Sequence, residues 1–261
     1  MALRCGKRGM LGVESLTERT IKIDRGRVTR PAYGWTATVH ELLRHLRANG
    51  FQRVPQPLAL VAGSETLTRI PGRSGVDGWR MVVREEGLRS FAGFLREYHE
   101  ATKGFQPSPG AGWAFHDGPT PPGSVICHGD IGPWNMVWRK GLPVGLVNFD
   151  FAGPGDPILD VAYALDYVTP FCDDEEALRW RAYTEPPDRR RRLSVFVEAY
   201  GWKGTPSLVD AVIAGQELDI VHVRTLAERD IEPQRTWVQE GMLERLAERV
   251  HWTEEHRALF E

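Results

Sequence analysis

Cysteine is scarce in this sequence, with only three among 261 residues. Cys5, Cys127 and Cys172 are scattered and lack the spacing of metal ligands. This argues against a disulfide framework and against a cysteine-based zinc site. We therefore expect a reduced protein of the cytoplasm.

Long apolar runs and an excess of one charge are also missing. No apolar stretch approaches the length of a membrane span, and the first residues lack the apolar core of a signal peptide. The 33 basic residues face 35 acidic ones, which argues against a broad nucleic-acid-binding surface. A small-molecule or peptide substrate fits better. With 41% hydrophobic and 26% charged residues, the chain is long enough for one or two globular domains.

The most informative stretch is residues 128–135, which read His-Gly-Asp-Ile-Gly-Pro-Trp-Asn, followed by Asn-Phe-Asp at residues 148–150. Phosphoryl transfer needs a carboxylate that accepts the proton of the acceptor hydroxyl, and oxygen ligands for the magnesium that bridges the phosphates. Asp130 has the chemistry of the base, and Asn135 can offer an amide oxygen to a metal. The pattern therefore predicts a phosphoryl-transfer site.

Short apolar runs on both sides predict how these residues come together. Val125–Cys127 would lead into the loop and Met136–Trp138 away from it. Arg139-Lys140-Gly141 predicts a turn into a second strand, Val144–Val147, whose end delivers residues 148–150 beside the loop.

The HGDxxxxN string, the hairpin and the run NFDFAGPGDPILD resemble the aminoglycoside phosphotransferase family, whose members are similar to protein kinases in fold. The resemblance is specific over residues 124–168. It implies Asp130 as the catalytic residue, Asn135 as a cofactor and metal ligand, and ATP (or GTP) with Mg²⁺ as cofactors. It further implies that residue 148 binds the metal.

Residue 148 departs from the family pattern, which usually has an aspartate there. Asn148 offers a neutral oxygen where a carboxylate would offer negative charge, and Mg²⁺ is normally held by one or two carboxylates. We expect weaker metal binding, with Asp150 as a substitute ligand, unless Asn148 is itself an introduced substitution.

Several other residues have a structural alternative to a functional role. His128 is a candidate catalytic residue beside Asp130, but a histidine that hydrogen-bonds the loop is the favoured interpretation. Asp156 and Asp160 are expected to cap and orient the following helix. The run Arg189–Arg192 is expected to be a solvated helix face rather than an anion-binding patch. Core packing is expected for most of the tryptophans near the motif, rather than stacking on a base; these are Trp113, Trp134 and Trp138.

Residues 1–70 are predicted to form an N-terminal kinase-like lobe with a small sheet and one helix. A hairpin is expected around Asp24-Arg25-Gly26, and a helix with the buried stripe Val39, Leu42, Leu43 and Leu46. Two more strands are expected at about 58–61 and 66–70. The family's phosphate-binding Lys and its partner Glu map best to Arg30 and His40, and histidine lacks the permanent charge of glutamate. A glycine set at residues 6–12 (GKRGMLG) is a weak nucleotide-loop candidate, because it has no flanking strand and helix.

Residues 71–261 are predicted to form a helical C-terminal lobe with the catalytic loop. Helices are expected at about 84–102, 188–200, 207–229 and 235–250, and another after the motif.

The sequence therefore predicts an α+β, bilobal protein-kinase-like fold and an ATP-dependent phosphotransferase. The acceptor would be a hydroxyl of a small molecule, such as an antibiotic or metabolite, or of a peptide. Three departures favour an alternative: Asn148, the Arg30 and His40 pair, and the lack of a clear glycine-rich loop. In that alternative the chain is a catalytically degenerate relative that binds a ligand or a protein partner, or performs different chemistry in the same cleft.

Overall fold

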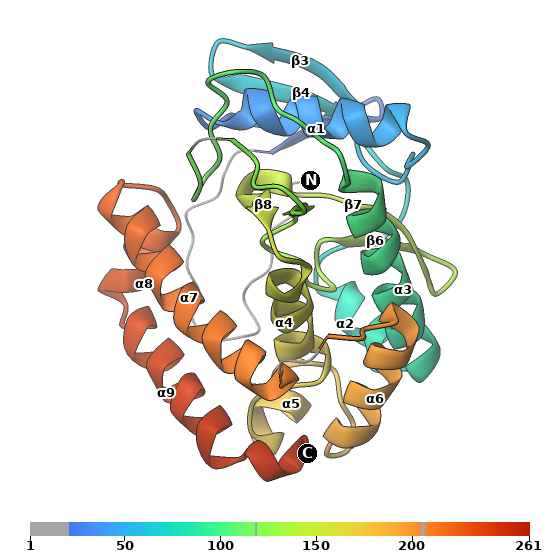
Figure 1. Ribbon diagram of the computed structural model, residues 1–261, viewed down its shortest axis with the longest axis vertical. Helices are drawn as coiled ribbons and strands as arrows, with labels where there is room; N and C mark the ends of the chain where they lie inside the picture. The colour runs from blue at the N-terminus through green and yellow to red at the C-terminus, as the bar shows by residue number, and fades with distance from the viewer. Residues whose placement is uncertain (1–20, 118, 205–206) are drawn as a thin grey trace.

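The computed structural model describes residues 21–117, 119–204 and 207–261. Figure 1 shows a small sheet with one helix at one end of the molecule and a larger, mainly helical part below it. None of the helices in the described ranges is both long enough and apolar enough to cross a membrane. The glycine set at residues 6–12 lies outside the described residues.

The N-terminal sheet is antiparallel with the strand order β1-β2-β4-β3. The expected hairpin is confirmed, and its turn residues Arg25 and Gly26 both have the positive φ that a tight two-residue turn needs. The register places Arg30 directly opposite Glu65. The strands are β1 (Lys22–Asp24), β2 (Arg27–Pro31), β3 (Pro57–Val61) and β4 (Ser64–Thr68).

Helix α1 (Thr36–Ala48) lies alongside this sheet (Figure 1). Its predicted stripe is buried, because apolar residues three and four apart share one helix face. The stripe residues are Val39, Leu42, Leu43 and Leu46. The sheet and α1 lie within residues 22–68, and the exact domain boundary at residue 70 stays a prediction.

The helical part is built on pairs of packed helices. Helix α3 packs against α6, α4 against α7, and α7 against both α8 and α9. The helices are α2 (Asp77–Val82), α3 (Glu85–Thr102), α4 (Pro157–Val168), α5 (Asp174–Trp180), α6 (Arg189–Tyr200), α7 (Leu208–Glu228), α8 (Gln234–Gln239) and α9 (Met242–Glu255), with a short 3-10 turn η2 (Arg257–Leu259) at the end.

Two expectations about these helices were wrong. The single helix expected at 235–250 is two helices, because Gly241 has a φ of 77° and breaks the chain between α8 and α9. The run Arg189–Arg192 is not a wholly solvated face. Arg189 and Arg192 are buried, and Arg192 donates to the carbonyls of Val82 and Val168 at the ends of α2 and α4. Helix C-termini leave such carbonyls without helical partners, so these guanidinium groups tie helix ends together.

Two short strand pairs bring the motif residues together. Strand β5 (Val125–Cys127) leads into the loop 128–135 and pairs with β8 (Gly153–Gly155). Strand β6 (Met136–Arg139) leaves the loop and pairs with β7 (Leu142–Leu146). The 3-10 turn η1 (Phe149–Phe151) joins β7 to β8. Because both strands that flank the loop pair with the strands that flank residues 148–150, these two segments must lie side by side.

Helix α2 and the residues directly before it contact the loop. Gly75 donates its N–H to the carbonyl of Trp134 at 2.8 Å. Gly78 approaches so closely that a Cβ there would lie 1.9 Å from the carbonyl oxygen of Pro133. Such an approach is available only to glycine.

We therefore expect Gly78→Ala to lower the free energy of unfolding by about 2 kcal/mol, because backbone must shift to admit the methyl group. Gly93→Ala in α3 is the matched control. A Cβ at Gly93 meets nothing within 4 Å, so it should stabilise the helix by about 0.5–1 kcal/mol. Urea unfolding of both variants measures the difference. Equal effects at the two positions would contradict the close approach.

Candidate phosphoryl-transfer site

The carboxylate of Asp130 lies at the centre of the loop and is only 3% exposed. The amide nitrogen of Asn135 donates to the Asp130 backbone carbonyl at 2.8 Å and to its Oδ2 at 2.9 Å. The hydroxyl of Tyr163, on α4, donates to Oδ1 at 2.7 Å. These donors fix the orientation of the carboxylate. Because the side-chain nitrogen of Asn135 donates to Asp130, the side-chain oxygen of Asn135 is the atom left for a further partner.

His128 is fully buried, and backbone groups use both of its ring nitrogens. Nδ1 accepts from the N–H of Asp130 at 3.2 Å, so it carries no proton, and Nε2 donates to the carbonyl of Val147 at 3.1 Å. Burial lowers the pKa of His128, which keeps the ring neutral as this arrangement requires. His128 thus ties the loop to the end of β7, in line with the favoured interpretation, and its candidate catalytic role stays a prediction.

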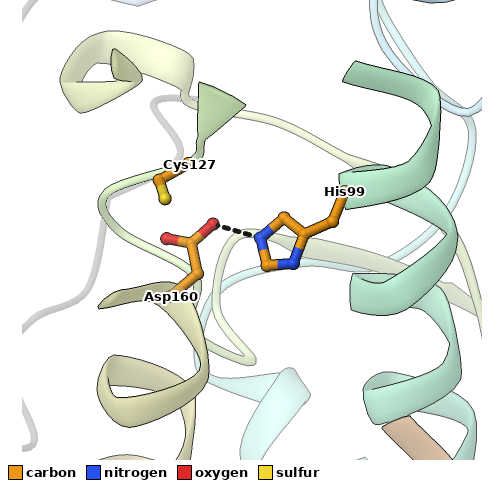
Figure 2. A group of neighbouring side chains, drawn as sticks. All are labelled: His99, Cys127 and Asp160. Atoms are coloured by element: carbon orange, nitrogen blue, oxygen red, sulfur yellow. Dashed lines mark hydrogen bonds and ion pairs between the residues drawn. The ribbon is translucent and has the colours of Figure 1, made fainter. Parts of the chain in front are cut away.

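Asp160, on α4, holds the start of the loop. Its carboxylate accepts the N–H of His128 at 2.6 Å and the N–H of Gly129 at 3.0 Å. It also accepts from Nε2 of His99, on α3, at 3.0 Å (Figure 2). Burial by itself would raise the pKa of Asp160, but the hydrogen bond and charge of His99 lower it below its usual value. Asp160 therefore positions the loop as well as the helix; Asp156 caps that helix, as expected.

The thiol of Cys127 lies near this pair, and together His99, Cys127 and Asp160 have ligand atoms within 4.8 Å of one another (Figure 2). In this structure each of the three side chains has a hydrogen-bond partner within the protein. Burial raises the pKa of Cys127 well above its usual value, so the sulfur keeps its proton and donates to the carbonyl of Asp156. The other ring nitrogen of His99 is used by the hydroxyl of Tyr200 at 2.8 Å. The group is a hydrogen-bonded support for the loop.

We expect Asp160→Asn to lower the free energy of unfolding by about 3 kcal/mol, because an amide nitrogen would face a buried N–H and leave it unpaired. Asp156→Asn is the control. It keeps a helix N-cap that asparagine fills as well as aspartate, so it should have little effect. Thermal unfolding of both variants measures the difference. If the stability of Asp160→Asn equals that of the wild type, the carboxylate does not hold the loop.

Asn148 and Asp150 lie beside Asp130 and share a partner that the sequence analysis did not assign to them. Arg30 donates through Nη1 to the amide oxygen of Asn148 at 2.8 Å and to Asp150 Oδ2 at 3.0 Å, and through Nη2 to Asp150 Oδ1 at 2.7 Å. The Asn148 nitrogen points towards Asp130 Oδ2, 3.5 Å away. Asn148 has a φ of 71°, which asparagine tolerates better than most residues.

Glu65 is the residue that the sequence analysis missed. Arg30 donates through Nε to Glu65 Oε1 at 2.6 Å, and Nε2 of His40 lies 2.8 Å from Glu65 Oε2. The negative charge expected on α1 therefore comes from the neighbouring strand β4. His40 is buried against Glu65, and its expected part in cofactor binding stays a prediction. In the sequence, Glu65 stands one residue before the strand expected at 66–70, and only the observed register sets it opposite Arg30.

The expected magnesium ligands can be tested against this arrangement. Asn135, Asn148 and Asp150 offer oxygens, the kind of ligand that Mg²⁺ takes, but only one of them is a carboxylate. Both oxygens of Asp150 and the side-chain oxygen of Asn148 already accept from Arg30. Burial alone would lower the pKa of Arg30, but Asp150 and Glu65 raise it, so the guanidinium stays charged. As arranged, this set of donors does not fit a magnesium ion.

Three aromatic rings lie in contact in a row that begins at the residue after Asp150. Phe151, directly after Asp150, contacts Phe115, whose ring stacks on His222 of α7 with centroids 3.7 Å apart. The tryptophans near the motif are buried, as expected from core packing; they are Trp113, Trp134 and Trp138. Burial lowers the pKa of His222 to about 4. His222 is therefore neutral at physiological pH.

A depressed histidine pKa makes stability depend on pH in a defined window. In the unfolded chain His222 is protonated below about pH 6.5, whereas in the folded protein it is protonated only below about pH 4. The stability present above pH 6.5 is therefore lost as the pH falls towards 4, by about 2 kcal/mol. His222→Phe keeps the stack and removes this loss. We expect the wild type and this variant to diverge in urea unfolding between pH 7 and pH 4.5, and parallel curves would contradict the assignment.

The comparisons with known proteins agree with this geometry. Residues 111–194 match the phosphotransferase enzyme family. The trifolitoxin immunity protein of Rhizobium leguminosarum bv. trifolii is 38% identical over 168 residues, which cover 62% of this chain and 63% of that protein. The chain thus spans less than two thirds of that relative. The resemblance inferred from the motif is confirmed, and residues 111–194 carry the family's pattern.

Solved structures of kinases share the fold over most of the chain. Choline kinase LicA from Streptococcus pneumoniae has a TM-score of 0.58 at 12% identity and covers 92% of both chains. Amicoumacin kinase hAmiN has a TM-score of 0.54 at 13% identity, covering 91% of this chain and 88% of its own. Spectinomycin phosphotransferase APH(9)-Ia has a TM-score of 0.55 at 10% identity, covering 87% and 86%. These likenesses confirm the bilobal protein-kinase-like fold.

Proposed function

We propose that this protein is a nucleotide-dependent phosphotransferase that transfers a phosphoryl group from ATP or GTP to a hydroxyl of a small molecule or a peptide. One observation carries the proposal: a carboxylate, Asp130, is held in a fixed orientation by Asn135 and Tyr163 beside Asn148 and Asp150. Catalysis of phosphoryl transfer depends mainly on positioning and on neutralising charge, and this arrangement supplies a positioned base. The family match over residues 111–194 supports the same reaction class.

In the proposed reaction Asp130 accepts the proton of the acceptor hydroxyl. A carboxylate has two oxygens with about four acceptor positions, so Asn135 and Tyr163 can orient it while it accepts a further hydrogen bond. The hydrogen bonds of Asp160 and His128 keep the loop backbone from moving as the proton is transferred. Of the predicted magnesium ligands, only Asn135 takes part in these steps, as a hydrogen-bond donor to Asp130.

For nucleotide binding, the described residue with an expected role in phosphate binding is Arg30. Arg30 was expected to bind phosphate, but a guanidinium has five N–H donors and four of them are used by Glu65, Asn148 and Asp150. Counting only partners within residues 21–117, 119–204 and 207–261, a phosphate group would therefore meet a single remaining N–H, unless it displaces one of these acceptors. We infer that phosphate binding and the pairing of Arg30 compete.

The acceptor class is inferred from the relatives. One relative is named for immunity to a toxin, and two structural neighbours are named as kinases or phosphotransferases of amicoumacin and spectinomycin. We infer that the acceptor here is a hydroxyl-bearing toxin or antibiotic, so that phosphorylation would serve resistance or biosynthesis. The aromatic surface of Phe115, Phe151 and His222 is suited to an acceptor with an apolar face.

A second candidate function is favoured by the pairing of Arg30. Because that guanidinium occupies oxygens expected to bind a metal, the chain fits a degenerate relative that binds a toxin or a protein partner without transferring phosphate. Nucleotide binding separates the two functions. Calorimetry with ATP or GTP, with and without Mg²⁺, should detect binding by a phosphotransferase. Absence of binding under all these conditions favours the second function.

For the phosphotransferase, we expect Asp130→Asn to reduce the transfer rate at least about 100-fold, because an amide cannot accept the proton. Labelled phosphate from ATP would be followed onto a panel of aminoglycosides, choline and serine-containing peptides. Asp24→Asn, at the exposed end of β1, is the control and should keep full activity. Wild-type turnover by a folded Asp130→Asn variant would remove Asp130 from its proposed role.

A further inference from the structure

We propose that Arg30 is the resident cation of this site: its guanidinium takes the place of a divalent metal on Asn148 and Asp150. The free protein then holds no divalent ion on these oxygens. This inference concerns the chain in the absence of nucleotide. It stands whether the protein transfers phosphate or only binds a partner.

The first argument is the number and geometry of the hydrogen bonds. Nη1 and Nη2 of Arg30 bind the two oxygens of Asp150 as a fork, at 3.0 and 2.7 Å, and Nη1 also reaches the oxygen of Asn148 at 2.8 Å. Paired charge-assisted bonds of this kind are the strongest that a carboxylate makes with a side chain. A metal ion that took these oxygens would have to displace all three contacts at once.

The second argument is burial. Arg30 is 8% exposed, Asp150 6% and Glu65 1%. Removing one partner from a buried ion pair is costly, because the other charge stays in a poorly hydrated place. If a divalent ion displaced the guanidinium, Arg30 would remain held through Nε by Glu65 and would lie beside the incoming positive charge. The site is therefore stabilised in its arginine-bound form.

The third argument is the match between Asn148 and a cation of single charge. An aspartate at residue 148 would suit a divalent ion, but here it would place a third carboxylate beside Asp130 and Asp150. Asn148 instead accepts from Arg30 through its oxygen and directs its nitrogen at Asp130 Oδ2, 3.5 Å away. A carboxylate cannot make the second contact, since it has no donor.

These observations make the departures from the family pattern a single coordinated change. Arg30 bridges Asp150 to Glu65, Glu65 in turn binds His40, and Asn148 fits between Arg30 and Asp130. Arg30 and Asn148 are then parts of one arrangement, and neither is a separate loss of a metal-binding residue. Restoring the aspartate alone would leave the guanidinium in place and would not restore the metal.

Titration with Mn²⁺ without nucleotide, followed by the loss of free-ion paramagnetic resonance signal, tests the inference. The proteins are the wild type, Asn148→Asp, Arg30→Gln and the double variant Arg30→Gln/Asn148→Asp. Arg27→Gln, an exposed position on the same strand, controls for the lost charge. We expect the double variant to bind Mn²⁺ at least about tenfold more tightly than the wild type, Asn148→Asp or Arg27→Gln. Adding Asp150→Asn to the double variant should abolish the gain.

Two results would overturn the inference. One is a gain in Asn148→Asp as large as that in the double variant, and the other is a double variant that folds but gains nothing. Circular dichroism establishes folding. If Arg30→Gln does not fold, the test is the comparison of the wild type with Asn148→Asp, because both keep the buried ion pair. Mn²⁺ binding that is tenfold tighter in Asn148→Asp than in the wild type contradicts the inference. Equal Mn²⁺ binding by the two proteins supports it. Because no nucleotide or acceptor is present, a failure of the proposed phosphotransferase activity leaves this outcome unaffected.

Discussion

The buried guanidinium of Arg30 joins the two parts of the molecule. It lies on β2 in the N-terminal sheet, yet it binds Asn148 and Asp150 in the helical part and Glu65 within its own sheet. The indole of Trp35, at the start of α1, adds a bond to the carbonyl of Asp150 at 2.7 Å. This charged network therefore helps to set the position of the sheet relative to the catalytic loop, together with the apolar packing of α1 against α3. Its charged members Arg30, Glu65 and Asp150 are buried, so the network is costly to break from either side.

A second network of hydrogen bonds fixes the position of the loop that contains Asp130. Asp160 binds two successive backbone N–H groups, and His128 joins the loop to the end of β7. Both residues are fully or almost fully buried, and neither reaches out to a substrate. The chemistry proposed for Asp130 thus rests on groups that act through the backbone. Both ring nitrogens of His128 are used to hold the loop backbone.

Much of this could be predicted from local patterns. The apolar stripe from Val39 to Leu46 predicted α1. The motif and its flanking apolar runs predicted the hairpin after the loop, and they predicted that residues 148–150 lie beside residues 128–135. Glu65 could not be assigned, because its role depends on a register between strands separated by 35 residues in sequence. The burial of Arg192 likewise depends on carbonyls 24 and 110 residues away. Local periodicity identifies elements, but it does not say which charged side chains will meet between them.

The central claim is that an arginine, and not a divalent ion, occupies Asn148 and Asp150 in the free protein. The most direct measurement is a crystal structure of the wild-type protein soaked in Mn²⁺ without nucleotide, with anomalous scattering data collected near the manganese edge. The account predicts no anomalous peak at these oxygens and continuous density for the guanidinium between Glu65 and Asp150. A peak within bonding distance of the Asn148 and Asp150 oxygens, with Arg30 turned away, would contradict it.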